Sequence, residues 1–500
     1  MQERYVVTAD LGSSKIALTV ARITDDVAEI IYSRETPSDG IRYSCVFNPT
    51  RAAAALKRAV SEAETELDIK IHQLVVGLPR YSVRQEMASA TIERSDPDSC
   101  ITAEEIRGLK SIAYDGYPIN DNVNETIYGG VVQSFTADDL IQASEEDVIG
   151  TVSSKIDGNY KLFIGSRKAV DNIDVMLNNT GLACARKIFL PHHTARAVLT
   201  ADEMENGCGL VEIGAGVSSI SLYRGSILRY YASIPYGGKV ITSDIKYEGS
   251  FNEKLAENIK LAYGACIPEK LQSMSEKILQ INDDETGSYV HLPVKYLSEV
   301  ITARMREIFD ALLFLIQDSG MKEQLRSGLV ITGGGAGLTG AANLLREMSG
   351  YNVKTGYPRL KGILSNCPET GETAMAASAG MILSCCRDSH INCVEETGSK
   401  AAAATATTAA TVREAPAPAV PVREESREAV REQVQEKPAE TDLFGNELEQ
   451  EAPRPKKKAE TREPAAKPTW KLLSKISSKV TDTLDNTLGT LFDQMGTPEE

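Results

Sequence analysis

Two acidic residues in this chain each stand two positions before a glycine, at the end of an apolar run. Asp10 leads into Gly12-Ser13-Ser14-Lys15, and Glu212 leads into Gly214-Ala215-Gly216. A glycine turn lets the backbone approach a phosphate closely and point successive N–H groups at it. A carboxylate at the preceding strand end can hold Mg²⁺, usually through water. The two turns predict a phosphate site with Asp10 and Glu212 beside a magnesium ion, which Asp10 holds through water.

A third glycine turn, Gly333-Gly334-Gly335, follows the apolar run Leu329–Thr332. It can admit an adenine and a ribose, because no side chain intervenes there. In the first turn, Ser13 and Ser14 add hydroxyl donors and Lys15 adds a cation within reach of phosphate oxygens. Two similar acid-glycine turns in one chain predict a duplicated fold that closes on one nucleotide.

The elements that must position these turns alternate along residues 1–393. Short strand-like runs such as Gln73–Gly77 and Leu210–Ile213 are separated by helical patterns, which is α/β character. Arg51–Leu67 is alanine-rich with apolar residues at helical spacing, and Pro49-Thr50 offers it a start. We therefore predict an α/β fold that consists of two similar lobes.

Changes of texture along the chain predict the domain boundaries. A stretch of strand-like runs around one helix-like piece indicates an inserted α+β subdomain, and a helix-rich stretch interrupts the second half in the same manner. The predicted parts are a first lobe at 1–82, completed by about 170–205 and 358–393, an inserted subdomain at 83–169, a second lobe at 206–357 with a small subdomain at about 246–306, a linker at 395–468 and a C-terminal helix at 469–496.

Composition narrows the class of protein. Five hundred residues exceed what one core organises, so several domains are expected. The net charge of -16 argues against a general nucleic-acid binder, which needs a broad basic footprint. We find no apolar signal segment at the N-terminus and no apolar run long enough to span a membrane, and we expect a cytoplasmic protein. Four residues near the end of the folded part could hold a metal, although helix-end cysteines in a reduced cytosol are the commoner explanation: Cys385, Cys386, His390 and Cys393.

The three turns together resemble those of the actin-like ATPase superfamily, with its two phosphate loops and its adenosine loop. Within it, the chain is similar to the FtsA family of bacterial cell-division proteins. Asp10-Leu11-Gly12-Ser13-Ser14-Lys15-Ile16 is similar to that family's first phosphate loop, and Ser233–Ile245 to the stretch after its second. Ala256-Glu257-Asn258-Ile259-Lys260-Leu261-Ala262-Tyr263-Gly264 resembles the helix whose lysine, here Lys260, lies by the base. The resemblance covers about residues 4–385.

The resemblance implies a duplicated actin-like (ribonuclease H-like) two-lobe fold with ATP and Mg²⁺ between the lobes. It also implies a protein that polymerises into filaments and tethers the ring of the tubulin-like protein FtsZ to the membrane. The FtsZ C-terminal peptide would bind within about 246–306, and other division proteins would be recruited later. The implied place is the cytoplasmic face of the bacterial inner membrane, at the division septum.

Departures from the family pattern bear on hydrolysis. The second loop begins with Glu212 where the family has Asp, and the extra methylene moves the carboxylate relative to an ion with strict octahedral geometry. The loop's usual threonine is Val217, for which Ser218 is the nearest hydroxyl. Because phosphoryl transfer depends on positioning and charge stabilisation, ATP binding with weak or absent hydrolysis is expected.

A further departure lies before Pro191. The family commonly has a glutamate there, a candidate for orienting the attacking water, and this chain has Leu190. His192 and His193 follow, and they are either substitutes for that glutamate or exposed loop histidines.

The C-terminal segment predicts membrane contact. Residues 395–468 are rich in Ala, Thr, Pro, Glu, Lys and Arg, which predicts disorder. An apolar stripe at helical spacing follows, interleaved with lysines, and the alternative to an anionic membrane surface is packing against the folded body. The stripe consists of Trp470, Leu472, Leu473, Ile476, Val480, Leu484, Leu488, Leu491 and Phe492.

Other functions of the same superfamily remain alternatives. A small-molecule kinase would need a substrate pocket with a general base, and it has no use for a linker and an amphipathic tail. A heat-shock chaperone ATPase would carry a β-rich peptide-binding domain after the third turn. Another actin-like cytoskeletal or assembly ATPase is the nearest alternative.

Overall fold

The computed structural model describes residues 3–25, 27–119, 124–267, 269, 277–283 and 288–395, without the side chains of 282, 283 and 288–290. The predicted linker, apart from residue 395, and the predicted C-terminal helix lie outside these residues. Among the helices of the described part, none has the length and apolar character that a membrane-crossing helix needs.

The first lobe is built on a six-stranded sheet in the order β11-β6-β1-β2-β3-β19. Three consecutive strands form an antiparallel meander, and two later strands extend it in parallel beyond β1. β19 is added in parallel to the outer edge of β3. The strands are β1 (Glu3–Leu11), β2 (Lys15–Thr24), β3 (Val27–Pro37), β6 (Gln73–Gly77), β11 (Ala183–Ile188) and β19 (Ile363–Ser365).

The second lobe repeats this topology. Its sheet has the order β14-β13-β12-β17-β18, again with an antiparallel meander followed by two parallel strands beside its first strand. The strands are β12 (Cys208–Ile213), β13 (Ser218–Arg224), β14 (Ile227–Ile234), β17 (Leu329–Thr332) and β18 (Val353–Thr355). The predicted duplicated α/β fold is confirmed.

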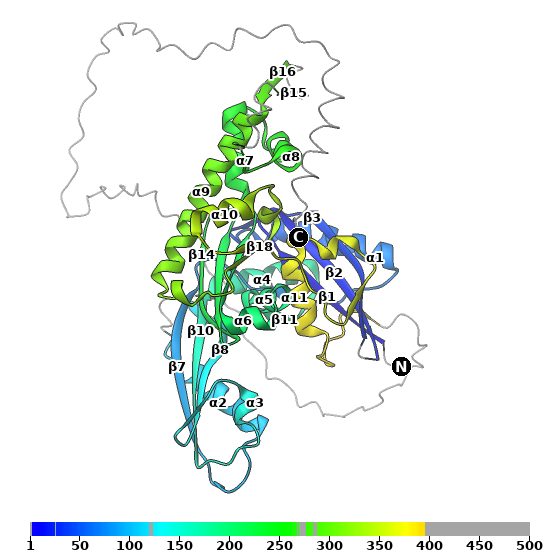
Figure 1. The fold of residues 1–500 in the computed structure, drawn as a ribbon. Coiled ribbons are helices and arrows are strands. Elements are labelled where there is room, and N and C mark those ends of the chain that lie inside the picture. Colours follow the sequence, from blue (N-terminus) through cyan, green and yellow to red (C-terminus); the bar gives the residue numbers. More distant parts are fainter. Residues whose placement is uncertain are drawn as a thin grey trace, which may run out of the picture. The chain divides into compact units, whose positions relative to one another are not determined.

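Helices surround both sheets (Figure 1). Helix α1 begins at Pro49, where the side chain of Asn48 accepts from the N–H of Arg51, and its alanine-rich face is buried against the first sheet. The other helices of the first lobe are α4 (Arg167–Thr180), α5 (Leu190–Val198), α6 (Ala201–Asn206) and α11 (Ala376–Cys385), and α1 itself spans Pro49–Leu67. Those of the second lobe are α7 (Gly238–Gly249), α8 (Glu253–Tyr263), α9 (Val294–Asp318) and α10 (Ala341–Ser349).

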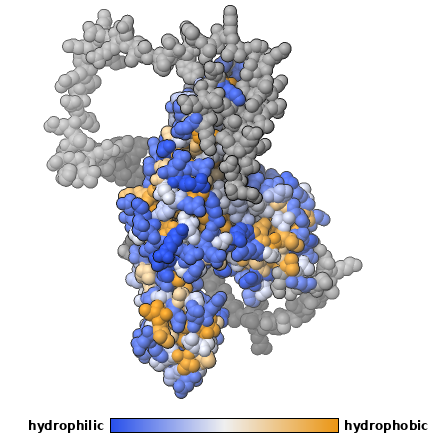
Figure 2. All heavy atoms as spheres, in the orientation of Figure 1, coloured by the Kyte–Doolittle hydropathy of each residue, from blue (hydrophilic) through white to orange (hydrophobic). Residues whose placement is uncertain are grey.

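The segment between β6 and α4 forms a sheet of its own, in the order β7-β10-β8-β9. Its hydrophobic cluster is separate from those of the two lobes. The elements are β7 (Arg84–Glu93), α2 (Ala103–Asp115), β8 (Glu125–Ala137), β9 (Leu140–Gln142), α3 (Glu145–Val148) and β10 (Lys155–Ser166). Exposed apolar side chains gather on this part of the molecule, around α2 and α3 (Figure 2).

Smaller elements complete the fold. Two of them, β15 and β16, form an antiparallel hairpin between α8 and α9. β4 and β5 form a short hairpin between β3 and α1. The strands are β4 (Ile41–Arg42), β5 (Cys45–Val46), β15 (Ile278–Asp283) and β16 (Ser288–Pro293). The 3-10 turns in the described residues are η3 (Lys322–Gln324), η4 (Gly334–Gly337), η5 (Pro368–Gly371) and η6 (Thr373–Met375).

Candidate functional site: a nucleotide cleft between the lobes

The two acid-glycine turns occupy equivalent places in the two sheets. Asp10 is the next-to-last residue of β1, and Glu212 is the next-to-last residue of β12. Each turn then leads into the second strand of its meander. In the first turn the N–H of Gly12 donates to the Asp10 carbonyl at 3.1 Å, and in the second the N–H of Gly214 donates to the Val217 carbonyl at 2.9 Å. The predicted correspondence of the two turns is therefore present in the fold.

The first and second turns touch each other across the lobes. A Cβ added to Gly216 would lie 2.7 Å from Oγ of Ser13, so the two turns approach closely at this point. Lys239, at the start of α7, donates from Nζ to the Ser13 carbonyl at 2.8 Å. The Ser13 hydroxyl also accepts from the N–H of Ser44 at 3.1 Å. The turns thus form one site rather than two separate ones.

The third turn lies against the end of β12. Gly333 has φ of 89°, and a Cβ there would lie 2.5 Å from the Ile213 carbonyl oxygen. A Cβ on Gly335 would lie 2.2 Å from Cγ2 of Ile213. Gly334, between them, is exposed and has open space around the position of a Cβ. Gly333 and Gly335 therefore allow the turn to pack against the end of β12. Gly334 leaves the outer face of the turn without a side chain.

An arginine that we did not predict from the sequence stands between the two acidic residues. Nη2 of Arg80 lies 2.8 and 3.1 Å from the two carboxylate oxygens of Asp10, and Nη1 pairs with Oε1 of Glu212. The three side chains are 13%, 15% and 10% exposed for Arg80, Asp10 and Glu212. The hydroxyl of Tyr231, on β14, donates to the Arg80 carbonyl at 2.5 Å. Arg80 thus connects the first lobe to the second.

The electrostatics of this cluster keep the arginine charged. Burial opposes the charge on Arg80, but the neighbouring Asp10 and Glu212 carboxylates together raise the pKa of the guanidinium above its ordinary value. Burial raises the pKa of the Glu212 carboxyl, and Arg80 limits that rise. Removing one partner of a buried ion pair typically costs about 3–5 kcal/mol, because the other charge is left uncompensated.

The arrangement does not fit the magnesium site that we predicted at Asp10. Mg²⁺ requires an octahedral shell of oxygens at about 2.0–2.1 Å. Here Arg80 occupies the space between the two carboxylates on which that shell would depend.

Arg80 could have been predicted by comparing the segments that follow the fourth strand, in chain order, of each of the two similar sheets. β6 runs parallel to β1, and β17 runs parallel to β12. The segments that follow β6 and β17 therefore leave their sheets at the edge where the acid-glycine turns lie. The third glycine turn follows β17, and its counterpart after β6 is Leu78-Pro79-Arg80.

The cations that we predicted from the sequence are engaged within the protein. Lys15 pairs with Glu35 across the β2–β3 ladder. Lys260 is buried behind the second turn and donates from Nζ to the Gly238 carbonyl at 3.1 Å, to Oγ1 of Thr242 at 2.9 Å and to Oε2 of Glu257 at 2.8 Å. Burial lowers the pKa of Lys260, and Glu257 opposes that effect.

Ser14 in the first glycine turn and Ser218 after the second differ in burial. Ser218 does not replace the missing threonine, because it is buried and donates to the Tyr236 carbonyl at 2.8 Å. Ser14 is only partly buried, and its carbonyl accepts from the N–H of Ser38 at 3.0 Å. Ala215, in the second turn, accepts at its carbonyl from the N–H of Lys239 at 2.8 Å. The second turn therefore offers backbone groups rather than a threonine-like hydroxyl.

The reading of His192 and His193 as exposed loop residues is wrong. Both lie in the first turn of α5 and are partly buried. Nδ1 of His192 lies 3.4 Å from the hydroxyl of Tyr223, and the two imidazole rings contact each other. Leu190 is buried in the core of the first lobe. Their contacts are thus with the protein interior.

We expect these histidines to make the protein sensitive to mild acid. Burial, and secondarily His193 and Arg196, lower the pKa of His192 to about 4. Below about pH 6.5 His192 is protonated in the unfolded chain but stays neutral in the folded chain. The free energy of unfolding therefore decreases as the pH is lowered from about 6.5 to about 4. His192→Gln should reduce the loss of unfolding free energy between about pH 7 and about pH 5 by about 1–2 kcal/mol. Urea unfolding of both proteins at the two pH values measures this, and equal losses would contradict it.

Of the four residues near residue 390, the three cysteines pack into or against the core of the first lobe, and His390 is exposed. Cys385 and Cys393 are buried in the core of the first lobe, and the N–H of Cys393 donates to the Tyr5 carbonyl at 2.7 Å. Cys386 donates to the Leu383 carbonyl, and the N–H of His390 donates to Asp388. In the described residues, no group of His, Cys, Asp and Glu side chains is placed to hold a metal ion.

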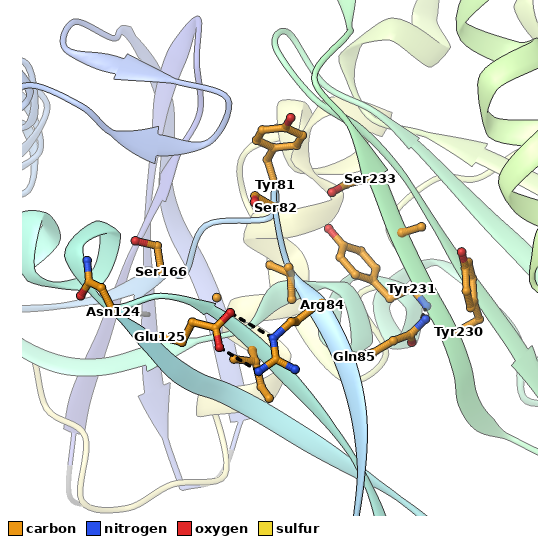
Figure 3. A pocket seen from close by; sticks show the side chains of 14 residues that line it. Tyr81, Ser82, Arg84, Gln85, Asn124, Glu125, Ser166, Tyr230, Tyr231 and Ser233 are labelled. Carbon is orange, nitrogen blue, oxygen red and sulfur yellow. Dashed lines mark hydrogen bonds and ion pairs between the residues drawn. The ribbon is translucent and has the colours of Figure 1, made fainter. Parts of the chain in front are cut away.

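A cavity of about 530 Å³ lies beside the chain that follows Arg80. It is bordered by residues 81–85, 124–125, 164–166 and 230–233, where the inserted sheet meets both lobes. Figure 3 shows the aromatic side chains of Tyr81 and Tyr231 and, below them, Arg84 paired with Glu125. The glycine turns do not border this cavity. It is therefore distinct from the candidate site at the glycine turns.

The duplicated sheets, with the three glycine turns at their facing edges, define an actin-like fold. The model of the family "Cell division protein FtsA" matches residues 209–380. Cell division protein FtsA of Neisseria meningitidis serogroup B is 29% identical over 391 residues, which cover 77% of this chain and 91% of that protein. The FtsA of Enterococcus hirae is 28% identical over 359 residues, covering 71% of this chain and 79% of that protein.

A solved structure has the same fold. The chain matches one from the PilM-PilN type IV pilus biogenesis complex with a TM-score of 0.54 and 15% identity, over 76% of this chain and 98% of that one. The predicted likeness to the FtsA cell-division proteins is confirmed.

Proposed function

We propose that the chain is a cell-division protein that binds ATP between two actin-like lobes, forms filaments and tethers the FtsZ ring to the cell membrane at the septum. One observation carries the proposal: the duplicated sheets bring three glycine turns together, in a chain related to FtsA proteins. Later division proteins are recruited by the assembled filament.

In this proposal the site holds the nucleotide more than it cleaves it. Backbone N–H groups of the turns bind phosphate oxygens, and the bare outer face of the third turn receives the adenosine. Leu190 is buried and Ser218 is engaged with Tyr236, so neither supplies a group that orients an attacking water. Mg²⁺ at Asp10 would require Arg80 to leave the two carboxylates.

The surface that we propose for the FtsZ tail lies on the small part of the second lobe. Tyr247 on α7 and Leu261 on α8 are 78% and 73% exposed. Tyr296, near the start of α9, is partly exposed and donates its hydroxyl to Glu248. Exposed aromatic and apolar side chains supply the anchors of peptide interfaces.

The inserted sheet supplies a second protein-binding surface. Its last strand, β9, is an edge strand, and Leu140 and Ile141 on it are 68% and 77% exposed. An edge strand with apolar side chains is suited to adding a partner's strand or helix. We propose that other division proteins or a second copy of this chain bind here.

The membrane contact that we propose is made by Trp470, Leu473 and the rest of the C-terminal stripe, at the cytoplasmic face of the membrane. Interleaved lysines near an anionic surface add about 1 kcal/mol each. One such helix is a weak anchor, and many of them along a filament bind together by avidity.

The test is sedimentation of the full chain with vesicles that contain anionic lipid. The protein should pellet with the vesicles, more strongly with ATP, and carry a labelled FtsZ C-terminal peptide with it. Leu473→Glu should weaken vesicle binding at least about tenfold, because it puts a charge into the apolar stripe that would enter the membrane surface. Leu448→Glu, in the predicted linker, is the matched control and should bind as the unmodified chain does. If Leu473→Glu still pellets fully, the membrane assignment is wrong.

A further inference from the structure

We propose that the Arg80 guanidinium occupies the position of a divalent cation between Asp10 and Glu212 and excludes a divalent cation from that position. If the proposed function holds, a nucleotide binds here without needing Mg²⁺. The exclusion of a divalent cation concerns the protein alone.

The position of Arg80 is fixed from both lobes. Its Nη2 contacts Asp10 of the first lobe and its Nη1 contacts Glu212 of the second, so both carboxylates face one guanidinium. Its backbone carbonyl accepts from the hydroxyl of Tyr231, and Pro79 precedes it. A side chain held at both ends in this way is pre-organised rather than a passing surface contact.

The charges of the site balance with Arg80 in place. Two facing carboxylates without a cation would repel each other and would also repel a phosphate chain. The guanidinium does not lose its proton, so its charge is present at every physiological pH. The lysines that we placed at the turns are committed elsewhere: Lys15 pairs with Glu35, Lys239 with the Ser13 carbonyl and Lys260 with Glu257. Arg80 is therefore the group that neutralises these acids.

Arg80 also keeps donors for a ligand. An arginine has five N–H donors, and the bonds to Asp10 and Glu212 come from Nη1 and Nη2 only. Among the described residues Nε–H has no hydrogen-bond partner, and a phosphate oxygen, which binds a guanidinium strongly, could accept from it. The same side chain can thus hold the lobes together and contact the nucleotide.

The first experiment needs no variant. The full chain is titrated with ADP by calorimetry in Mg²⁺ and in excess EDTA. We expect the two dissociation constants to agree within about threefold, a difference of well under 1.4 kcal/mol. ADP that binds more than about tenfold tighter with Mg²⁺ than with EDTA would overturn the inference.

The second experiment measures melting temperature with Mg²⁺ alone, without nucleotide. Mg²⁺ should leave the unmodified chain unchanged and raise the melting temperature of Arg80→Ala by about 2–4 °C, because the freed carboxylates now bind the ion. Arg80→Lys keeps a cation and should not respond. Arg84→Ala is the matched control, since Arg84 also pairs with two glutamates, Glu86 and Glu125, but at an exposed place, and it should not respond either.

The outcomes separate this inference from the proposed function. If ADP binds in neither buffer, the nucleotide function fails, and the melting curves alone decide the role of Arg80. If Mg²⁺ shifts the unmodified chain as much as Arg80→Ala, or shifts neither, the guanidinium does not hold the cation position. If Arg80→Ala does not fold, the ADP titrations in Mg²⁺ and in EDTA decide, because they use the unmodified chain.

Discussion

Replacing Gly334 with valine should weaken ATP binding about a hundredfold, a loss of about 2.7 kcal/mol, and leave the melting temperature unchanged. Gly334 is exposed, its φ is not in the left-handed region, and nothing lies within 4 Å of an added Cβ. The protein therefore tolerates a side chain there. An adenosine on the bare outer face of the third turn does not, because the valine methyl groups take its place.

Gly337→Val is the matched control for this experiment. Gly337 lies in the same short 3-10 turn, is also exposed and also has open space at its Cβ position. Fluorescence titration with a labelled ATP analogue, with competition by ATP, measures both variants. Equal affinities for Gly334→Val and Gly337→Val would remove the third turn from the proposed nucleotide site.

The second prediction concerns two glycines in helices, for which the same substitution should have opposite effects. A Cβ on Gly380 of α11 would lie 2.7 to 2.8 Å from the backbone of His193 and Thr194 on α5. Backbone atoms cannot move aside as the end of a flexible side chain can. Because of this clash, Gly380→Ala should destabilise the protein by about 2–3 kcal/mol. On Gly108 of α2 a Cβ meets nothing within 4 Å, so Gly108→Ala should stabilise by about 0.5–1 kcal/mol.

Denaturant unfolding of both variants measures this pair. For Gly108→Ala the increase is to be sought in the transition of the inserted subdomain, because that part has its own hydrophobic cluster. If Gly380→Ala is neutral, the close crossing of α5 and α11 is not a constraint on the fold. If Gly108→Ala destabilises, the helix has a neighbour that the described residues do not provide.

Local elements followed closely from the sequence. The helix expected over 51–67 is α1, which begins two residues earlier because Pro49 suits the first helical position and Asn48 supplies the cap. The apolar runs before the three glycine turns are β1, β12 and β17, since β-branched residues bounded by glycine favour strands. These features depend on residues that are close together in the chain, so they can be predicted from the sequence pattern.

Contacts between distant segments were harder to predict. The partly buried place of His192, the engagement of Ser218 with Tyr236 and the pairing of Lys15 with Glu35 were all missed. Each depends on which side chain of another element comes near, and sequence spacing does not carry that information. The four residues near residue 390 show the same effect, because the sulfurs that are neighbours in sequence point into packed core or to carbonyls.

By itself the sequence determined that the chain has two acid-glycine turns and a third glycine turn, each after a strand, and hence the class of fold. It did so because glycine and strand preferences are local properties of the backbone. The tertiary structure alone decided what stands between Asp10 and Glu212. Arg80 is 70 positions from the first and 132 from the second, and only the closing of two sheets on each other brings its charge between theirs.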